Sequence, residues 1–471
     1  MRAGAPEGAA GKGRGVLKQL ETNAELTGQV LRFSLPLMLT GILQLAYNAA
    51  DSVVVGRYAG SVSLAAVGST TSLVFLLVTL FNGVSVGANY VAANRYGAGD
   101  EAGVARAVQC AGVLSVLMGV IAGLVGLVLS GPMLRLMHTA EDVLPLAELY
   151  LRIYFLGTPA LVVYNFGSAI LRAVGDSTRP LYFMLISGSA NVALNLLLVV
   201  VFRMGVAGVA IATTVSQCLS AGMVTLRLCT TRDCCRLYLN RLRLYRQEAL
   251  MMLKVGFSSG LQGVVFSISN VMIQSQVNTF GSAVMAGNSA AASLEGFIHI
   301  SQNAFAQASL TFMSQSMGAK KPRRAERIFL ICMALTLGLG MALCGVLLLF
   351  RVPLLRFYIK PGEAAQAAVL AAGVARVMII GRFQWLGGLM ETACNSLRGL
   401  GKSMNPTVTT LVGACGLRVV WIYTVFARAG TIRSLYWSYP VSWFLTLAVH
   451  LVFLYLARRA LQAHQQNGGL P

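Results

Sequence analysis

The sequence predicts an all-α polytopic membrane protein, with twelve transmembrane helices in two six-helix bundles that are related by a parallel internal repeat. The composition is the first observation: of 471 residues, 56% are hydrophobic and only 11% are charged, against roughly 25% charged residues in soluble domains. The second observation is a series of long uncharged runs, separated by clusters of Lys and Arg. The third is that sequence patterns of the first half return in the second half.

The uncharged runs have the length of membrane-spanning helices. Residues 111–133, 184–202, 207–226 and 331–350 are examples, and each is close to the ~20 residues that cross ~30 Å of hydrocarbon as a helix. A transmembrane barrel would instead show alternating segments of about ten residues, and the sequence has no such pattern. Polar breaks divide the chain into twelve expected helices, at 32–56, 61–93, 104–130, 144–170, 181–202, 206–228, 250–280, 283–316, 326–350, 368–396, 406–427 and 434–457.

The formal net charge of +21 is explained by membrane topology. A nucleic-acid-binding protein gathers its positive charge on a soluble face, and this chain has no soluble domain, so no nucleic-acid partner is expected. Most of the 37 Lys and Arg residues fall on one side of the twelve-helix scheme. By the positive-inside rule, both termini are expected in the cytoplasm. We therefore expect a multi-pass protein of the cell (inner) membrane, surrounded by lipid and monomeric.

The polar stretches define the expected domains. The first residues are rich in Gly and Ala and lack the apolar core of a secretory signal, which indicates a disordered cytoplasmic tail. The expected segments are the tail at 1–25, an N-terminal bundle at 26–228, a basic cytoplasmic connector at 229–249, a C-terminal bundle at 250–460 and a second cytoplasmic tail at 461–471.

Two short patterns reveal the internal repeat. LRAVGDSTRP from Leu171 matches LRGLGKSMNP from Leu397, and RYGAG from Arg95 aligns with SMGAK from Ser316. Six helices per copy is an even number, so the two copies run in the same direction and are related by an axis along the membrane normal. In the longer pattern we expect Gly to adopt a positive φ and Pro to start the next helix, while Arg anchors at the headgroups.

Two bundles with a cavity between them are the architecture of an alternating-access carrier. A membrane scaffold or receptor without transport activity is the alternative from another class. The sequence contains neither HExxH nor a GxxxxGK[ST] loop, so neither a membrane enzyme nor an ATP-driven pump is favoured. We expect no cofactor.

The first helix carries a polar face that includes a carboxylate. Gln44, Tyr47, Asn48 and Asp51 follow one another at spacings of three and four, which gathers them on one side of a helix. A charge at the centre of a bilayer is costly, so such residues face a cavity and mark an ion or substrate path. Pro36, near the start of the same helix, removes a backbone hydrogen bond and is the expected hinge.

The second half has polar residues inside its expected helices too. Glu295 is followed by His299 and Gln302 at helical spacing, and Glu391 lies two helices further on. For Glu295, a helix–helix hydrogen bond or a position near the membrane rim is the alternative to a cavity. The residues expected to line a substrate cavity are Gln44, Asn48, Asn165, Asn270, Gln274, Asn278, Glu295, Gln302 and Glu391.

The candidate interior charges lean negative. Asp51, Glu295 and Glu391 stand against Arg382 and Arg418. This balance favours organic cations as substrates.

Several longer stretches resemble one family. They are YNAADSVVVGRYAG in the first helix, LRAVGDSTRP after the fourth, NVALN and GVAGVAIATTVSQ in the fifth and sixth, and GLQGVVFSISNVMIQSQVN and SLEGF in the second half. Over about residues 30–460 the sequence is similar to the multidrug and toxic compound extrusion (MATE) transporters, in the bacterial branch with NorM- and DinF-like members. The resemblance implies a secondary active antiporter that exchanges organic cations or drugs for H+ or Na+. A flippase for lipid-linked oligosaccharides, from the same superfamily, is the alternative within transport.

The resemblance also implies a coupling site in the N-terminal bundle. In the family, the first-helix Asp works with an Asn and an Asp on the fifth helix and a Thr on the sixth, and Asp51, Asn191 and Thr213 match these positions. Asn195 stands where many members carry Asp, and it neither titrates nor contributes charge. Asp51 is then the one carboxylate of a set completed by Tyr47, and it is the expected position for a coupling H+ or Na+.

Overall fold

The structure is a computed structural model that describes residues 22–59, 61–137, 139–358 and 366–466. Within these ranges the chain forms helices and no strands. Six long rods make up the first half: α1 (Asn23–Val54) with a π-helical turn η1 (Val55–Ala59), α2 (Ser61–Gly97), α3 (Glu101–Leu136), α4 (Leu144–Ala173), α5 (Thr178–Asn195) with η2 (Leu196–Val201), and α6 (Gly205–Thr230).

Six further rods make up the second half. A short 3-10 turn, η3 (Leu239–Arg241), lies in the connector between the halves. The rods are α7 (Arg246–Asn278), α8 (Ser282–Gly318), α9 (Pro322–Leu349) followed by the short α10 (Arg351–Tyr358), α11 (Gln366–Arg376) joined through η4 (Val377–Gly381) to α12 (Arg382–Gly399), the rod α13 (Met404–Thr410), η5 (Leu411–Gly416), α14 (Leu417–Trp421), η6 (Ile422–Phe426) and α15 (Ala427–Ala429), and finally α16 (Ile432–Gln466).

Twelve helical rods were expected, and twelve are found in the described part of the chain. Eleven of them are long and apolar enough to cross a membrane. The twelfth rod, α8, has a similar length but carries polar side chains such as Glu295, His299 and Gln302. The prediction of an all-α multi-pass membrane protein is confirmed.

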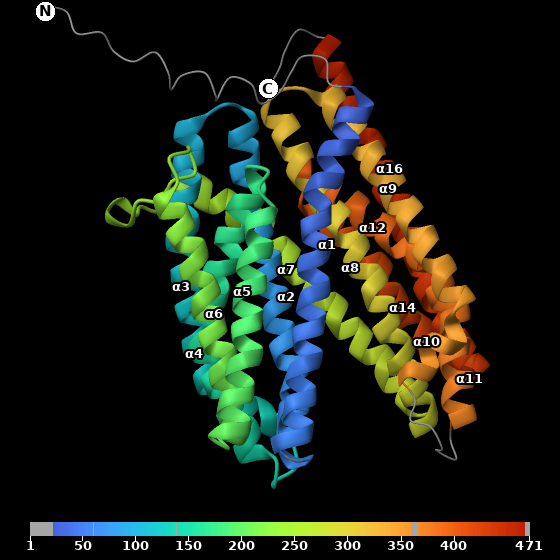
Figure 1. Ribbon diagram of the computed structural model, residues 1–471. Helices are drawn as coiled ribbons and strands as arrows, with labels where there is room; N and C mark the ends of the chain where they lie inside the picture. Colours follow the sequence, from blue (N-terminus) through green and yellow to red (C-terminus); the bar gives the residue numbers. More distant parts are fainter. Residues whose placement is uncertain (1–21, 60, 138, 359–365, 467–471) are drawn as a thin grey trace, which may run out of the picture.

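The rods gather into two bundles that stand side by side (Figure 1). In the first half, α3 packs on α4, and α4 and α5 pack on α6. In the second half, α8 packs on α9 and α12, and α12 packs on α16. The two largest apolar clusters lie around Phe166 in the first bundle and around Tyr436 in the second, and the first also includes Met252 at the start of α7. The expected two-bundle arrangement is confirmed.

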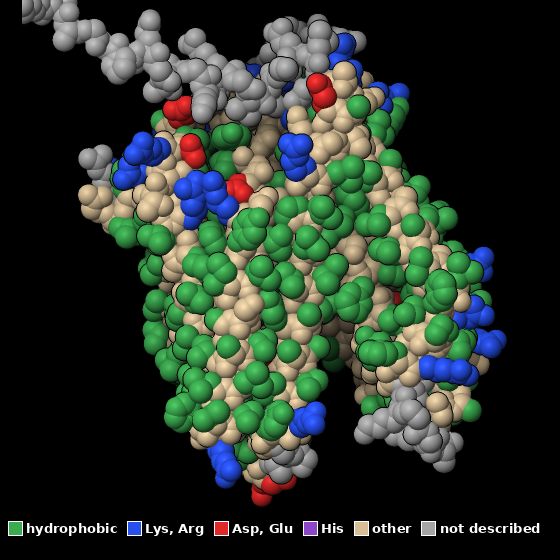
Figure 2. All heavy atoms as spheres, viewed as in Figure 1, with side chains coloured by type: hydrophobic (Ala, Val, Ile, Leu, Met, Phe, Trp, Pro, Cys, Tyr) green, Lys and Arg blue, Asp and Glu red, His purple; other side chains and the backbone are tan. Residues whose placement is uncertain are grey.

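The bundles join at the membrane end that carries the chain termini, and they do so through the repeat itself. A Cβ atom on Gly97, at the end of α2, would overlap the carbonyl oxygen of Gln315 on α8. In the same way, a Cβ on Gly318 would overlap the carbonyl oxygen of Asn94 on α2. These glycines belong to the matching RYGAG and SMGAK segments. Each copy of the repeat thus supplies a glycine that lets a helix of the other copy approach closely. At the opposite end the bundles stand apart, leaving a cleft between them (Figure 2).

Several boundaries differ from expectation. α1 begins at Asn23, before the helix start expected at residue 32, because Thr22 and Glu25 form a capping box in which each side chain accepts the other's backbone N–H. Pro36 therefore lies in the interior of α1 rather than near its start. α6 and α7 extend into the expected connector, and α16 continues to Gln466. Residues 1–21 and 467–471, which hold most of the expected tails, lie outside the described residues.

The repeated turn pattern behaves as expected at its glycines. Gly175 has a φ of +91° and Gly401 a φ of +80°, conformations that favour Gly. The expectation that Arg anchors at the headgroups is wrong for Arg398, which is only 5% exposed. Its guanidinium donates to Gln262 Oε1 at 2.7 Å and to Asn395 Oδ1 at 3.2 Å. Arg398 thus ties α12 to α7 inside the bundle.

Candidate functional site

The first candidate site lies where α1 meets α5 in the N-terminal bundle. Asn195 Nδ2 donates to Asp51 Oδ1 at 2.5 Å and lies 3.3 Å from Asn191 Oδ1. The two asparagines are four residues apart, so they share one face of α5. The π-helical turn η2 follows directly after Asn195, and such turns interrupt α-helices mostly at functional positions.

The site continues onto α6. Asn191 Nδ2 donates to Ser216 Oγ at 3.4 Å, and Ser216 Oγ donates to the carbonyl oxygen of Thr213 at 2.8 Å. Two buried oxygens, Asn195 Oδ1 and Thr213 Oγ1, have no hydrogen-bond partner among the described residues. Buried polar atoms are nearly always satisfied. A carboxylate together with neutral oxygens is also the ligand type that hard cations prefer. The arrangement can therefore accept a proton at Asp51 or a cation beside it.

Tyr47 has a different role from its neighbours. Its ring fills the space that a Cβ on Gly188 would occupy, and its hydroxyl donates to the carbonyl oxygen of Leu185 at 3.3 Å. Tyr47 therefore fixes α1 against α5. Two tyrosines of α4 near the site escaped the sequence analysis: Tyr150 and Tyr154 are buried and stack with ring centroids 6.3 Å apart. Their spacing of four is indistinguishable in sequence from ordinary packing.

The residues of the N-terminal bundle that were expected to line a substrate cavity form no hydrogen bond with Asp51 in the described part of the chain. Gln44 and Asn48 are exposed on α1. Asn165 is only 8% exposed in α4, and its Nδ2 has no partner among the described residues. The polar face predicted for α1 is thus divided into an accessible part and a part that packs against α5.

Glu391 forms a half-exposed polar cluster between α8 and α12. Asn303 Nδ2 donates to Glu391 Oε1 at 2.7 Å, and Gln307 Nε2 donates to Asn303 Oδ1 at 2.8 Å. His299 Nε2 lies 3.8 Å from Glu391 Oε2, and the side chains of His299 and Glu391 are 49% and 30% exposed. This carboxylate is accessible to a ligand.

Glu295 and Gln302 lie inside the C-terminal bundle rather than on an accessible wall. Arg376 Nη2 donates to Glu295 Oε2 at 2.7 Å, and both side chains are less than a tenth exposed. Gln302 is 0% exposed and packs against Gly340 and Gly388. Arg376 was missed in the sequence, because no local spacing links it to Glu295 on another rod.

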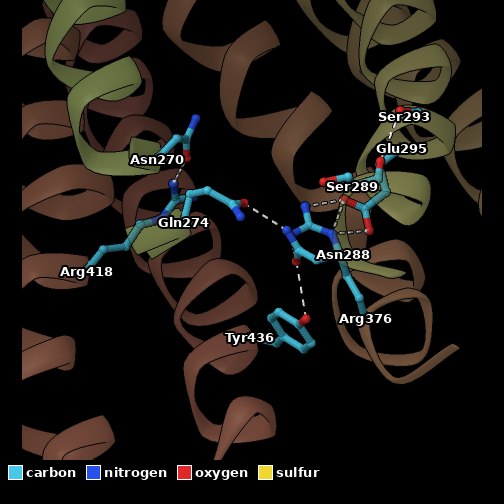
Figure 3. Close-up of polar contacts among 9 residues, drawn as sticks. All are labelled: Asn270, Gln274, Asn288, Ser289, Ser293, Glu295, Arg376, Arg418 and Tyr436. Atoms are coloured by element: carbon cyan, nitrogen blue, oxygen red, sulfur yellow. Dashed lines mark hydrogen bonds and ion pairs between the residues drawn. The ribbon is translucent and has the colours of Figure 1, made fainter. Parts of the chain in front are cut away.

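A relay of amides leads away from this ion pair (Figure 3). Arg376 Nη1 donates to Asn288 Oδ1 at 2.8 Å, and Asn288 Nδ2 donates to Gln274 Oε1 at 2.8 Å. Gln274 Nε2 then donates to Asn278 Oδ1 at 2.8 Å. The relay connects α11 through α8 to the last turns of α7.

Arg418, on α14, is fully buried. Its Nη1 donates to Asn270 Oδ1 at 3.1 Å and its Nε to Ser442 Oγ at 3.0 Å, whereas Nη2 has no partner among the described residues. The guanidinium carbon lies 4.2 Å from the ring centroid of Tyr439. Arg382, by contrast, is exposed.

The expected negative lean of the interior is therefore wrong for the C-terminal bundle. Glu295 is neutralised by Arg376, and Arg418 has no carboxylate partner in the described part of the chain. The count of interior charges in the sequence included Arg418 but left out Arg376, and it included Arg382, which is exposed.

Comparisons with known proteins bear on both bundles. The profile of the MatE family matches residues 36–197 and 257–424. The chain is 32% identical over 303 residues to the probable multidrug resistance protein YpnP of Bacillus subtilis, covering 64% of this chain and 68% of that protein. It is 22% identical over 329 residues to the FAD transporter of Shewanella oneidensis, covering 69% and 73%.

Solved structures share the fold. A multidrug resistance MATE family transporter in an outward-facing conformation aligns with a TM-score of 0.84 and 22% identity, over 95% of this chain and 100% of that one. A MOP superfamily transporter from Pyrococcus furiosus, described as having a binding pocket of reverse polarity, aligns with a TM-score of 0.86 and 22% identity, over 94% and 100%. Because the family profile matches more than half of the chain and falls in both bundles, the resemblance seen in the sequence is confirmed: the chain belongs to the MatE family.

Proposed function

We propose that this chain is a secondary active multidrug exporter that exchanges organic cations for H+ or Na+ by alternating access. One observation carries the proposal: Asp51 is a carboxylate inside a membrane-spanning helix, and its hydrogen bond goes to the neutral Asn195 on a neighbouring helix. No Lys or Arg forms an ion pair with it among the described residues. Its charge is thus left to be balanced by a proton, a metal cation or a cationic substrate.

Exchange follows from this competition. A ligand shifts a conformational equilibrium only by its different affinity for the two states. Asn195 donates to the ionised form of Asp51, so neutralising Asp51 weakens the contact between α1 and α5. Pro36 has no backbone N–H and so removes a hydrogen bond from the interior of α1, and we propose that α1 bends there when the contact changes. The coupling ion and the organic cation are then each bound on one side of the membrane and released on the other.

The orientation belongs to the same proposal. The bundles join at the end that carries the termini and stand apart at the other end, and the basic loops favour a cytoplasmic location for the joined end. This supports an outward-open state in the inner membrane, with both termini in the cytoplasm. Drug export as the physiological role is supported by the name of the relative YpnP, a probable multidrug resistance protein.

The test is transport by Asp51→Asn in proteoliposomes. A fluorescent organic cation is placed inside, and a pH gradient or a Na+ gradient is imposed separately. We expect gradient-driven extrusion to fall to the rate of empty liposomes, because the variant keeps the size of the side chain but not its charge. Asp142→Asn, an exposed acid outside the long helices, is the matched control and should behave as the parent. Extrusion by Asp51→Asn at the parental rate would disprove the proposal.

The carrier for lipid-linked oligosaccharides remains a second candidate. Arg418 favours it, because diphosphate-linked substrates require positive charge along their path and this guanidinium has no carboxylate partner in the described ranges. This function needs no exchange of a cationic dye. If neither the parent nor any variant extrudes the dye, but the parent moves a lipid-linked sugar between leaflets, this second function replaces the first proposal.

A further inference from the structure

The last turns of α7 present a stripe of three amides. Asn270, Gln274 and Asn278 follow at spacings of four, so they lie along one face of the helix. Asn278 is exposed and the other two are partly exposed. Asn270 and Gln274 are connected to buried networks that contain a guanidinium (Figure 3), and Asn278 is connected to the second of these through Gln274. The direction in which these amides point decides what they can bind.

Arg418 fixes the direction of Asn270. A guanidinium has donors only, so the atom of Asn270 that meets Arg418 Nη1 at 3.1 Å must be the oxygen. The Asn270 NH2 group is then turned away from Arg418, as Figure 3 shows. It has no hydrogen-bond partner among the described residues, and it is left to donate to whatever lies on the α7 face.

Arg376 fixes the rest of the stripe by the same logic. It must meet the oxygen of Asn288, so Asn288 turns its NH2 group toward Gln274 and must meet that oxygen. Gln274 in turn offers its NH2 group to the oxygen of Asn278. Asn278, at the exposed end of the relay, is left with an NH2 group that has no hydrogen-bond partner among the described residues. Two independent guanidinium groups thus impose the same polarity, with donors outward.

The charge beneath the stripe has the matching sign. Arg376 is neutralised by Glu295, but Arg418 is fully buried without a carboxylate partner in the described ranges, and its Nη2 is unpartnered. A guanidinium stays ionised in proteins, and a buried charge without compensation is costly. Contacts with the rings of Phe266 and Tyr439 compensate it in part. Of these two rings, that of Phe266 is partly exposed and offers an apolar surface beside the charge.

We infer that the α7 face, made up of Asn270, Gln274 and Asn278 and backed by Arg418, binds the oxyanion of an organic molecule. The group is a carboxylate or a phosphate, which accepts hydrogen bonds from the outward NH2 groups and is attracted by the buried charge. The inference goes beyond the exchange proposed at Asp51, because it concerns binding in the other bundle. It holds or fails whether or not Asp51 couples transport.

The probe is a pair of fluorescent molecules that differ by one oxyanion, riboflavin and its phosphate ester FMN. Each is titrated into the full chain in nanodiscs of neutral lipid, and binding is followed by fluorescence quenching. We expect FMN to bind about tenfold more tightly than riboflavin, the size of effect typical of a charge-assisted contact. Equal affinities for the two molecules in the parent protein would overturn the inference.

Variants locate the site. Asn278→Ala changes an exposed side chain, so the protein should fold, and we expect FMN affinity to fall severalfold while riboflavin affinity stays the same. Ser275→Ala, exposed on the same helix but off the stripe, is the matched control. Arg418→Gln should abolish the preference for FMN, with riboflavin binding reporting that the variant is folded. Parallel losses for both probes in Asn278→Ala would contradict an oxyanion site here.

A lipid headgroup could supply the same chemistry as a free substrate. The titration is therefore repeated in nanodiscs that contain phosphatidylglycerol. Unchanged FMN affinity indicates a site for free organic anions, whereas competitive loss of FMN binding, absent in Asn278→Ala, identifies the phosphate headgroup as the ligand. Either result supports the oxyanion site, and the two results distinguish a free organic anion from a lipid headgroup as its ligand.

Discussion

The two bundles use the same pair of helices with opposite polarity. In the N-terminal bundle the first rod bonds to the fifth through Asp51 and Asn195, an acid meeting an amide donor. In the C-terminal bundle the first rod bonds to the fifth through Asn270 and Arg418, an amide acceptor meeting a cation. Both fifth rods contain π-helical turns. The repeat thus preserves where the first and fifth rods meet, while the sign of the charge held there has reversed.

In this comparison, the ion pair of Arg376 with Glu295 adds no net charge to the C-terminal bundle. We therefore predict that it stabilises the fold. Arg376→Gln would leave Glu295 buried without its partner, and breaking a buried pair from one side costs about 3–5 kcal/mol. We expect the largest loss of thermal stability here, measured as the melting temperature of the detergent-solubilised protein. Arg376→Gln combined with Glu295→Gln should recover most of the loss. A double variant as unstable as the single one would mean that Arg376 acts through other contacts, such as that with Asn288.

The sequence predicted the architecture because composition and length determine it. A carboxylate in an apolar run, such as Asp51, stands out without any knowledge of its neighbours, and the resemblance supplied Asn191, Asn195 and Thr213. The partner of Glu295 could not be predicted, because Arg376 lies on another helix two rods along the chain. Local spacing says nothing about such a pairing.

The buried arginines were hidden for a second reason. Arg418 was counted among the interior charges, but the sequence does not show that it is buried without a carboxylate partner, nor that Arg376 pairs with Glu295. The direction of the amides on α7 was equally out of reach, because it follows from the guanidinium groups behind them. Polarity in this molecule is set by contacts between helices, which a single sequence does not display.

A second carboxylate in the N-terminal site would sharpen the difference between the bundles. In Asn195→Asp, two acids would face each other where an amide now donates to Asp51, and like charges at this separation favour binding of a proton or cation between them. We expect the half-saturating concentration of H+ or Na+ for dye extrusion to change about tenfold, within the usual range of coupling between sites. Transport is measured across a series of pH values and Na+ concentrations. Asn48→Asp, on the exposed part of α1, is the control, and ion dependence identical to the parent in Asn195→Asp would remove this residue from the coupling site.

The smallest effect is expected at a proline that only one of the two first rods contains. α1 contains Pro36 in its interior, whereas α7 contains no proline. Pro36→Ala restores the missing backbone hydrogen bond and stiffens α1. If bending at Pro36 follows the charge of Asp51, dye extrusion should slow by roughly two- to fivefold, because opening and closing steps set many turnover rates. The affinity for the dye should be unchanged. Pro132→Ala, in the interior of α3, changes a helix without a coupling residue and should leave the rate as in the parent. Equal slowing by both variants would show that α1 responds to general loss of helix flexibility, and the difference between the bundles would then reduce to the charges of Asp51 and Arg418 alone.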